Sequence, residues 1–494
     1  MNTIRPALIL ALLWAISPHS SAGQQDTLRL SLEDALKLAS TGNPAFLAAR
    51  NDEVAADWEV REAYASLLPS ASVGAILSYQ GAGEQRFGSF TLAQNLPAYY
   101  LSSYTIGLSY QLSGATLLAP SAARARRVAT SAQIRAAEVS LRAVVTRAYV
   151  EVLRRAEGEA LMARQLKRTR FNLRLAQGRH EVGAVTPLDV RQAEVRVGRA
   201  EVDLLQASNA LHTARLRLLQ EIGADGERTL VLTTDFDLDE PVWDREALRV
   251  TALESNPTLG ALRAALEAGT VQVRQAQTAY LPTLSAQAGI SGYTREATNS
   301  GSLIAQAQVA VAQQVQQCVL LNQLYSRLAD PLPGRDCSAI RFTDAERNQI
   351  VAQNDAFPFD FTRQPLTMSL SLSLPLFQGL TRERQLEVAK VQRDDADLQV
   401  REQRIALNTN LTIALGSVTT AYQSAVLEAR NRDVADEQLR LAGERYRVGA
   451  ISFVDLVEAE TVKAEADQAY VNAIYAYHDA VTDLGAVVGT PLRE

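Results

Sequence analysis

Residues 366–374 alternate apolar and hydroxyl side chains without a break, in the order Leu-Thr-Met-Ser-Leu-Ser-Leu-Ser-Leu. Because successive side chains of a strand point to opposite faces, this pattern predicts a strand with one apolar face and one wet face. Tyr104 to Leu112 alternates in the same way, and Ala71 to Tyr79 and Leu284 to Gly292 do so more weakly. Each segment has about nine residues, the length that a tilted strand needs to cross the hydrocarbon layer of a membrane.

Strands of a soluble sandwich would also alternate, but a second face rich in Ser, Thr and Gln is unusual for a sheet of four strands. Four strands cannot close a barrel, and an open sheet edge is not tolerated in lipid. Small bacterial barrels begin at about eight strands. If these segments span a membrane, several copies of the chain must therefore share one barrel.

Long helical patterns follow each pair of strands. They run from about Ala119 to Val182 and Leu188 to Glu221 in the first half, and from Leu380 to Val448 and Phe453 to Val488 in the second. At 1.5 Å per residue, helical runs of roughly sixty residues extend about 90 Å. Such rods predict a column of helices rather than a globule.

Small side chains recur at coiled-coil spacing along these helices. In the last helix they are Ala459, Val462, Ala466, Ala469, Ala473, Ala476 and Ala480, here called the alanine seam. The first half repeats the small seam with Ala193, Ala200, Ala207, Ala210 and Ala214. The partner run in the preceding helix has the same spacing but larger side chains, Leu411, Leu415, Val418, Tyr422 and Ala425. Small residues on a seam let backbones approach closely, so one helix can pack on two neighbours.

The two halves are repeats of each other. Leu68-Pro69 recurs as Leu281-Pro282, and Gly42-Asn43-Pro44 recurs as Ser255-Asn256-Pro257. A repeat of this size indicates one structural unit used twice. Each half reads as helix, strand, loop, strand, long helix, tip and helix.

A short turn interrupts the helical pattern once in each half. In the second half Gly449 can end one helix in the left-handed conformation, and Ser452 can cap the next with Asp455 as the acid of a capping box. The first half has Gly183, Thr186, Pro187 and Asp189 at the same places. Capping alone accounts for both acids, and a functional role for them is the alternative.

The chain begins with Arg5, an apolar run over 7–16 and Ser20-Ser21-Ala22, which together predict a cleaved secretory signal over 1–22. The apolar run is too short to span a bilayer as a helix. The formal net charge of the 494 residues is -6, without a basic run. This excess of acid argues against nucleic acid as a partner.

Cys318 and Cys337 are the two cysteines, and in an exported protein they favour a disulfide. The four histidines are scattered, and none forms a metal-ligand spacing with a cysteine or carboxylate. The sequence has no nucleotide-binding glycine loop and no nucleophile elbow. We therefore expect no metal, no cofactor and no enzyme activity.

Taken together, these features resemble the TolC-like outer-membrane efflux protein family. The most specific matches are the tips at 179–183 and 445–449 with Asp189 and Asp455, and Ser-Leu-Pro-Leu-Phe over 373–377. The resemblance implies a coiled-coil tunnel of helices joined to a transmembrane β-barrel, built from two tandem repeats. Each chain would supply four strands, and a homotrimer would close a twelve-stranded barrel.

The resemblance also implies function, location and partners. The protein would be the passive exit duct of a tripartite efflux or type I secretion system, with its barrel in outer-membrane lipid of a Gram-negative bacterium and its helices in the periplasm. A periplasmic adaptor, or membrane fusion protein, would couple it to an inner-membrane pump of the RND or ABC type. The alternative is a periplasmic coiled-coil scaffold that never enters the membrane.

We expect seven segments along the chain. They are the signal 1–22, periplasmic helices 23–67, β-hairpin 68–113, helical hairpin 114–223, linker and periplasmic helices 224–280, β-hairpin 281–377 with a long extracellular loop 294–364, and helical hairpin 378–494. Within the long loop, 302–328 and 343–356 have helical patterns. Since the loop holds both cysteines, we predict a small disulfide-tied lid over the barrel mouth.

The resemblance places a periplasmic gate at the tips. The acids matching Asp455 and Glu458 line the aperture in the family, while the residues matching Tyr446 and Asp189 help to hold it shut. A ring of Asp455 and Glu458 would attract cations, as acidic rings do in cation channels. Glu458 lies beyond the reach of capping, and the other repeat has Gln192 there.

The locking arginine of the family, two residues after the tip glycine, is Ile451 in this chain. Arg447 and Arg179 are the candidate replacements. The residues around the two glycines are the expected docking surface for the adaptor. They are Val182, Gly183, Ala184, Val448, Gly449 and Ala450.

Overall fold

The computed structural model describes residues 28–87, 90–225, 230–330 and 332–492. The predicted signal over 1–22 lies outside these residues. These residues divide into two compact units. One consists of the described residues within 1–58, 124–270 and 391–494, and the other of those within 59–123 and 271–390. None of the described helices is both long and apolar enough to cross a membrane.

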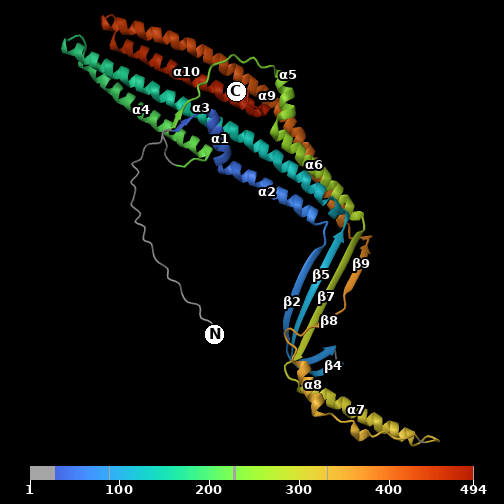
Figure 1. Ribbon diagram of the computed structural model, residues 1–494. Coiled ribbons are helices and arrows are strands. Elements are labelled where there is room, and N and C mark those ends of the chain that lie inside the picture. The colour runs from blue at the N-terminus through green and yellow to red at the C-terminus, as the bar shows by residue number, and fades with distance from the viewer. Residues whose placement is uncertain (1–27, 88–89, 226–229, 331, 493–494) are drawn as a thin grey trace, which may run out of the picture. The chain divides into compact units, whose positions relative to one another are not determined.

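The first unit is helical and consists of two repeats (Figure 1). The first repeat has β1 (Leu28–Leu30), α1 (Leu32–Gly42), α2 (Pro44–Ala65), α3 (Gly114–Glu181) and α4 (Pro187–Ile222). The second has β6 (Leu230–Leu232), α5 (Arg245–Ser255), α6 (Pro257–Gln277), α9 (Thr381–Arg447) and α10 (Phe453–Val488). The long helices occupy the predicted ranges, and α3 begins five residues earlier than expected.

The repeated Asn-Pro motif joins two helices in each repeat. Asn43 accepts a hydrogen bond from Phe46 N (3.0 Å) and donates one to the carbonyl of Glu221 (2.8 Å) at the end of α4. Asn256 accepts from Leu259 N (2.9 Å) and donates to the carbonyl of Val487 (2.9 Å) in α10. Each asparagine thus caps one helix and satisfies a terminal carbonyl of another, which explains the repeated motif.

Each repeat of this unit has an apolar core among its helices. The first centres on Tyr149 and Leu218, and the second on Tyr477 and Leu484, which are all fully buried. The Tyr149 hydroxyl donates to the carbonyl of Leu30 (2.9 Å) in β1. The parallel β1–β6 pair was not expected from the sequence.

The second unit contains an antiparallel sheet in the order β2–β5–β7–β9 (Figure 1). These strands are β2 (Ser70–Gln80), β5 (Tyr99–Leu112), β7 (Thr283–Ala297) and β9 (Thr367–Ser373). All four correspond to predicted strands. Their pairing brings the hairpins of the two repeats together, because β5 of one lies beside β7 of the other.

Side chains form separate apolar and polar rows across this sheet. One row consists of Ala71, Leu108, Ala288 and Met368. The next row consists of Ser70, Ser109, Gln287 and Ser369. Leu108 is 51% exposed and Met368 is 77% exposed. The sheet therefore presents an exposed apolar face and a polar face, as the alternation predicts, with β2 and β9 at its two edges.

The strand loops carry more structure than predicted. Strands β3 (Gly83–Phe87) and β4 (Phe90–Leu96) form a hairpin between β2 and β5. Strand β7 extends to Ala297, so the long insert begins after that residue, and β8 (Thr362–Arg363) returns to it. The insert contains α7 (Gly301–Tyr325) and α8 (Asp344–Asn354) near the predicted helices, and Cys318 and Cys337 are joined by a disulfide.

The alanine seam is mostly not buried within one chain. Ala459 is buried, but Ala476 is exposed and the remaining positions are half-buried. The buried stripe of α10 runs instead through Lys463, Asp467 and Val471. Part of α10 thus faces away from the helices of its own chain.

Candidate functional site at the helical tips

Each helical hairpin turns through a glycine with positive φ. Gly183 has φ 71° and Gly449 has φ 80°, so a side chain at either position would be strained. The backbone amide after each glycine donates a hydrogen bond to the end of the preceding helix. Ala184 N donates to Arg179 O and Ala450 N donates to Arg445 O, both at 2.8 Å. These bonds satisfy the last carbonyls of α3 and α9.

A complete capping box starts the second helix of each hairpin. Asp455 Oδ2 accepts hydrogen bonds from the backbone N (2.9 Å) and hydroxyl (2.8 Å) of Ser452, whose Oγ accepts from Asp455 N (3.2 Å). Thr186 and Asp189 make the same set. Hydrogen bonding from Ser452 lowers the pKa of Asp455. Capping therefore accounts for the position of both aspartates, and it keeps Asp455 ionised at neutral pH.

Arg179 of α3 reaches across to the other hairpin. Its Nη1 donates to the backbone carbonyl of Tyr446 (2.7 Å), and its guanidinium carbon lies 4.5 Å from the centroid of the Tyr446 ring. Burial raises the pKa of the Tyr446 phenol; the positive charge of Arg179 opposes this shift, and the negative charge of Asp189 adds to it. Arg179 thus holds the tyrosine by a charge-assisted hydrogen bond and by cation–π contact.

Tyr446 also belongs to an apolar cluster that joins the two hairpins. The buried members are Ala176, Ala193, Tyr446, Phe453, Leu456 and Val457. Ile451, at the position where the resemblance led us to expect an arginine, packs against this cluster and contributes apolar contact. Tyr446 is only 1% exposed, and its hydroxyl has no hydrogen-bond partner among the described residues.

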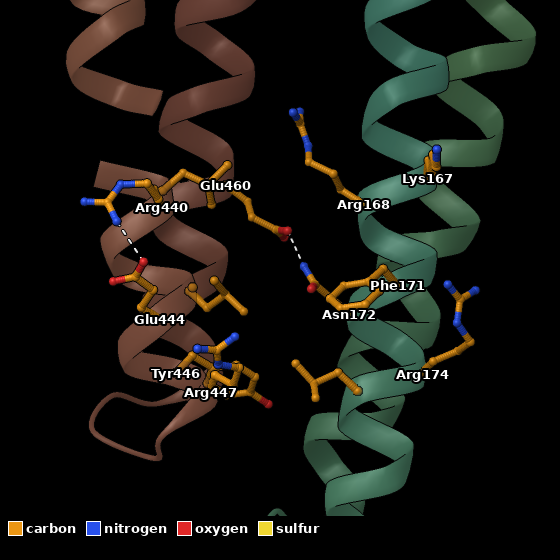
Figure 2. Close-up of a pocket in the computed structure, with 14 residues that line it drawn as sticks. Lys167, Arg168, Phe171, Asn172, Arg174, Arg440, Glu444, Tyr446, Arg447 and Glu460 are labelled. Carbon is orange, nitrogen blue, oxygen red and sulfur yellow. Dashed lines mark hydrogen bonds and ion pairs between the residues drawn. The ribbon is translucent and has the colours of Figure 1, made fainter. Parts of the chain in front are cut away.

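A second polar contact crosses between the hairpins about two turns further from the tips. Figure 2 shows Glu460 of α10 extending toward Asn172 of α3, whose side-chain amide donates to the carboxylate. Burial raises the pKa of Glu460, while the charges of Arg168 and Arg196 oppose the shift. A cavity of about 580 Å³ lies between these helices, with Phe171 and Leu439 in its lining.

The remaining predicted gate residues are not brought into contact. Asp455 and Glu458 are exposed, and Asp189 is half-buried within its capping box. Arg447 is exposed and has no ion pair within the described residues, so of the two candidate arginines it is Arg179 that contacts the other hairpin.

The predicted docking residues are at the surface of the turns. Val182 is 79% exposed and Val448 is 76% exposed. Gly183, Ala184, Gly449 and Ala450 are exposed as well. The two turns therefore offer small and apolar side chains to a partner.

Sequence reasoning missed two polar features near the tips. The contact of Asn172 with Glu460 is one, and the buried pair formed by Lys463 Nζ and Asp467 Oδ1 (2.8 Å) is the other. A signal for the pair was present, because Lys463 and Asp467 lie one turn apart on the same side as Ala459. No group of three or more His, Cys, Asp or Glu side chains in the described ranges is placed to hold a metal ion.

Comparisons with known proteins agree with this geometry. Residues 35–224 and 343–490 match the family described as outer membrane efflux protein. Outer membrane protein TolC of Escherichia coli is 25% identical over 506 residues, which cover 96% of this chain and 85% of TolC.

Solved structures match nearly the whole fold. The CmeC outer membrane channel of Campylobacter jejuni has a TM-score of 0.70 at 16% identity, covering 94% of this chain and 87% of CmeC. The outer membrane protein VceC of Vibrio cholerae has a TM-score of 0.65 at 18% identity, covering 94% and 97%.

Proposed function

Because the chain belongs to the outer membrane efflux protein family, we propose that it forms a trimeric duct whose periplasmic end is held closed by Arg179 and Tyr446. The protein is an efflux channel in the outer membrane of a Gram-negative bacterium, and channels of this family are transport ducts rather than enzymes. Trimer formation, the gate and the partners are the parts that we propose.

The sheet and the helices both support a trimer. Strands β2 and β9 leave the sheet open on both sides, and the hydrocarbon layer does not tolerate unpaired backbone groups. Three copies would supply twelve strands and remove every edge. The exposed part of the alanine seam, around Ala476, would then face the neighbouring protomer, where small side chains allow close helix packing.

The contact of Arg179 with Tyr446 is the observation that carries the gate. It joins α3 to the end of α9 at the tips themselves, where an opening would have to form. The turns on either side are satisfied within their own hairpins, so this contact can break without unfolding them.

We also propose a cation-attracting ring at the entrance. Asp455 is exposed and ionised, and Glu458 is exposed one turn further along α10 without a capping role. Three-fold symmetry would place three copies of both acids around one opening. Single-channel recording should show that Asp455→Ala combined with Glu458→Ala loses cation preference, whereas Asp189→Asn does not. Unchanged selectivity in the double variant would rule out the ring.

The exposed turns would dock the helical hairpins of a periplasmic adaptor, which connects the duct to an RND or ABC pump. Photo-crosslinking from Val182 and Val448 tests this, because both side chains are free in the isolated chain. Capture of one adaptor from both positions, and none from exposed Val242, is the expected result.

Fractionation tests the duct itself against a periplasmic scaffold. The duct predicts a heat-modifiable trimer in the outer membrane, and loss of efflux when the gene is deleted. A protein found in the soluble periplasmic fraction would support the scaffold instead. We expect the outer-membrane result, because in a soluble protein the apolar row of the sheet would remain exposed to water.

A further inference from the structure

Helix α7 in the long insert has no charged side chain over its whole length, Gly301–Tyr325. Charged residues make up 21% of the chain, so this is an unusual stretch for an exposed helix. Its side chains are mainly Ala, Val, Leu and Gln. Such a surface has neither the charges that hold anionic lipid headgroups nor those that repel a second copy of itself.

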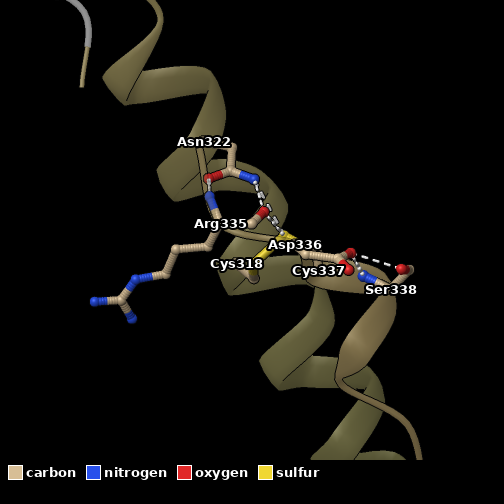
Figure 3. Close-up of a disulfide and its surroundings, with 6 residues drawn as sticks. All are labelled: Cys318, Asn322, Arg335, Asp336, Cys337 and Ser338. Atoms are coloured by element: carbon tan, nitrogen blue, oxygen red, sulfur yellow. Dashed lines mark hydrogen bonds between the residues drawn. A yellow bond between two sulfur atoms is a disulfide. The ribbon is translucent and has the colours of Figure 1, made fainter. Parts of the chain in front are cut away.

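One side of α7 is fixed by the returning chain (Figure 3). Cys318 is buried and bonded to Cys337. The Asn322 side chain accepts a hydrogen bond from Arg335 N and donates one to Arg335 O, each at 2.8 Å. This side of the helix is therefore occupied.

The opposite side is exposed and apolar. Val309 precedes Cys318 by about two and a half helical turns, which places it on the other side of α7. Leu320 and Leu324 share that side, and the three residues are 58%, 57% and 52% exposed. Ala305, Ala312 and Gln316 lie on the same side of α7 and are also exposed. Their three-to-four residue spacing is typical of a coiled-coil seam. We call these six residues the α7 face.

The insert is anchored at the end of a strand that the proposed barrel contains. Asn354 of α8 accepts from Ala297 N (2.9 Å) and donates to Ala297 O (2.8 Å), the last residue of β7. Phe357 N donates to Glu296 (2.9 Å) in the same strand. The α7 face is thus tied to a sheet whose open edges must pair with other copies.

The dimensions allow contact between copies. Twelve strands about 4.8 Å apart and tilted by about 40° give a barrel radius of roughly 12 Å. A helix of 25 residues extends about 37 Å. Each α7 can therefore reach its neighbours around the mouth of one barrel.

We propose that the α7 face binds the same helix of neighbouring protomers at the mouth of the channel, so that the insert forms a second trimer contact outside the barrel. This inference rests on the proposed trimeric duct. It identifies the partner of the insert as a second copy of this chain, and it gives the disulfide the role of holding α7 rigid with that face free.

Cysteine crosslinking tests the contact. Leu320→Cys is treated in outer-membrane preparations with a short bismaleimide, while the two native cysteines remain bonded to each other. Gln314→Cys is the control, because Gln314 is exposed on α7 about 120° away from Leu320. The unheated trimer band is recorded for both variants on the same gel.

We expect about two of every three chains to become covalent dimers with Leu320→Cys, the limit that a three-fold ring sets, and few with Gln314→Cys. A normal trimer band with no excess of dimers for Leu320→Cys would overturn this inference and leave the proposed duct intact. Crosslinking of Leu320→Cys to a different protein would overturn it as well. Absence of the trimer band would overturn both.

Discussion

Replacing Arg179 by Ala should open the periplasmic end of the channel. The substitution removes a charge-assisted hydrogen bond to the Tyr446 carbonyl and a cation–π contact with the ring. Such a bond contributes about 1.5–3 kcal/mol when well shielded, and an exposed cation–π contact about 0.5–1 kcal/mol. Arg179 is half-buried, so we take about 1–2 kcal/mol per protomer as the combined effect.

A trimer would contain three contacts of Arg179 with Tyr446, one in each protomer, and opening all of them together would multiply this effect. The closed state would lose about 3–6 kcal/mol, which shifts the closed-to-open equilibrium by roughly two to four powers of ten. The Asn172 contact with Glu460 and the apolar cluster remain, so the helices should stay folded. Arg179→Lys should be intermediate, because an ammonium keeps the charge but lacks the planar group that lies over the ring.

Conductance of purified trimers in planar bilayers measures the shift directly. The wild-type channel should show a small conductance with occasional opening events. The Arg179→Ala channel should show a larger conductance that is continuously open. Arg447→Ala is the matched control, since it also removes one arginine beside Tyr446 but breaks no ion pair within the described residues. Wild-type conductance in a folded Arg179→Ala trimer would refute the proposal that Arg179 holds the channel closed. A larger effect from Arg447→Ala would refute it as well.

Three further sets of substitutions test the packing of the helical unit by thermal or denaturant unfolding of the trimer. Tyr446→Phe should cost almost no stability, since the hydroxyl has no partner among the described residues, while Tyr446→Ala should cost about 3–5 kcal/mol. A large loss of stability with Tyr446→Phe would mean that a neighbouring chain forms a hydrogen bond with the hydroxyl. Burial raises the pKa of Asp479 to about 6; the charge of Arg154 opposes this shift and the charge of Asp483 adds to it. The folded state therefore binds this proton more tightly than the unfolded state, so stability should fall as pH rises from about 4 to about 6. Asp479→Asn should therefore raise the midpoint at pH 7.5 but not at pH 4, and equal gains at both would disprove the assignment. Asn43→Ala and Asn256→Ala should each cost about 1–3 kcal/mol, from the lost cap and the unpaired carbonyl, and a neutral effect of either would remove its role at the joint.

Local patterns in the sequence were sufficient for most of the fold. The range predicted for α10, Phe453 to Val488, is the one observed, because a capping serine and a left-handed Gly489 mark its two ends. The strands could be predicted because each alternates along its own length. The β3–β4 hairpin could not, since Gly83–Leu96 has only a few alternating residues and two interruptions of register.

Contacts between the two hairpins depend on information that no local pattern contains. Arg179 could be named as a candidate, but its partner depends on how α3 and α9 are rotated about their axes. Asn172 and Glu460 are separated by 288 residues, and their pairing depends on the same rotation. The alanine seam showed that α10 packs closely on something, but spacing alone does not distinguish a helix of the same chain from one of another copy.

The self-contained turns at the tips have a consequence for how such a channel can evolve. The hydrogen bonds that form each turn start and end within one hairpin, and in the described part of the chain Arg179 makes the polar contact between the hairpins at the tips. In the gate that we propose, the strength of closure is therefore separable from the stability of the scaffold. Mutation at one position could adjust the resting leak of the channel over a wide range, and the sequence would need no compensating change elsewhere.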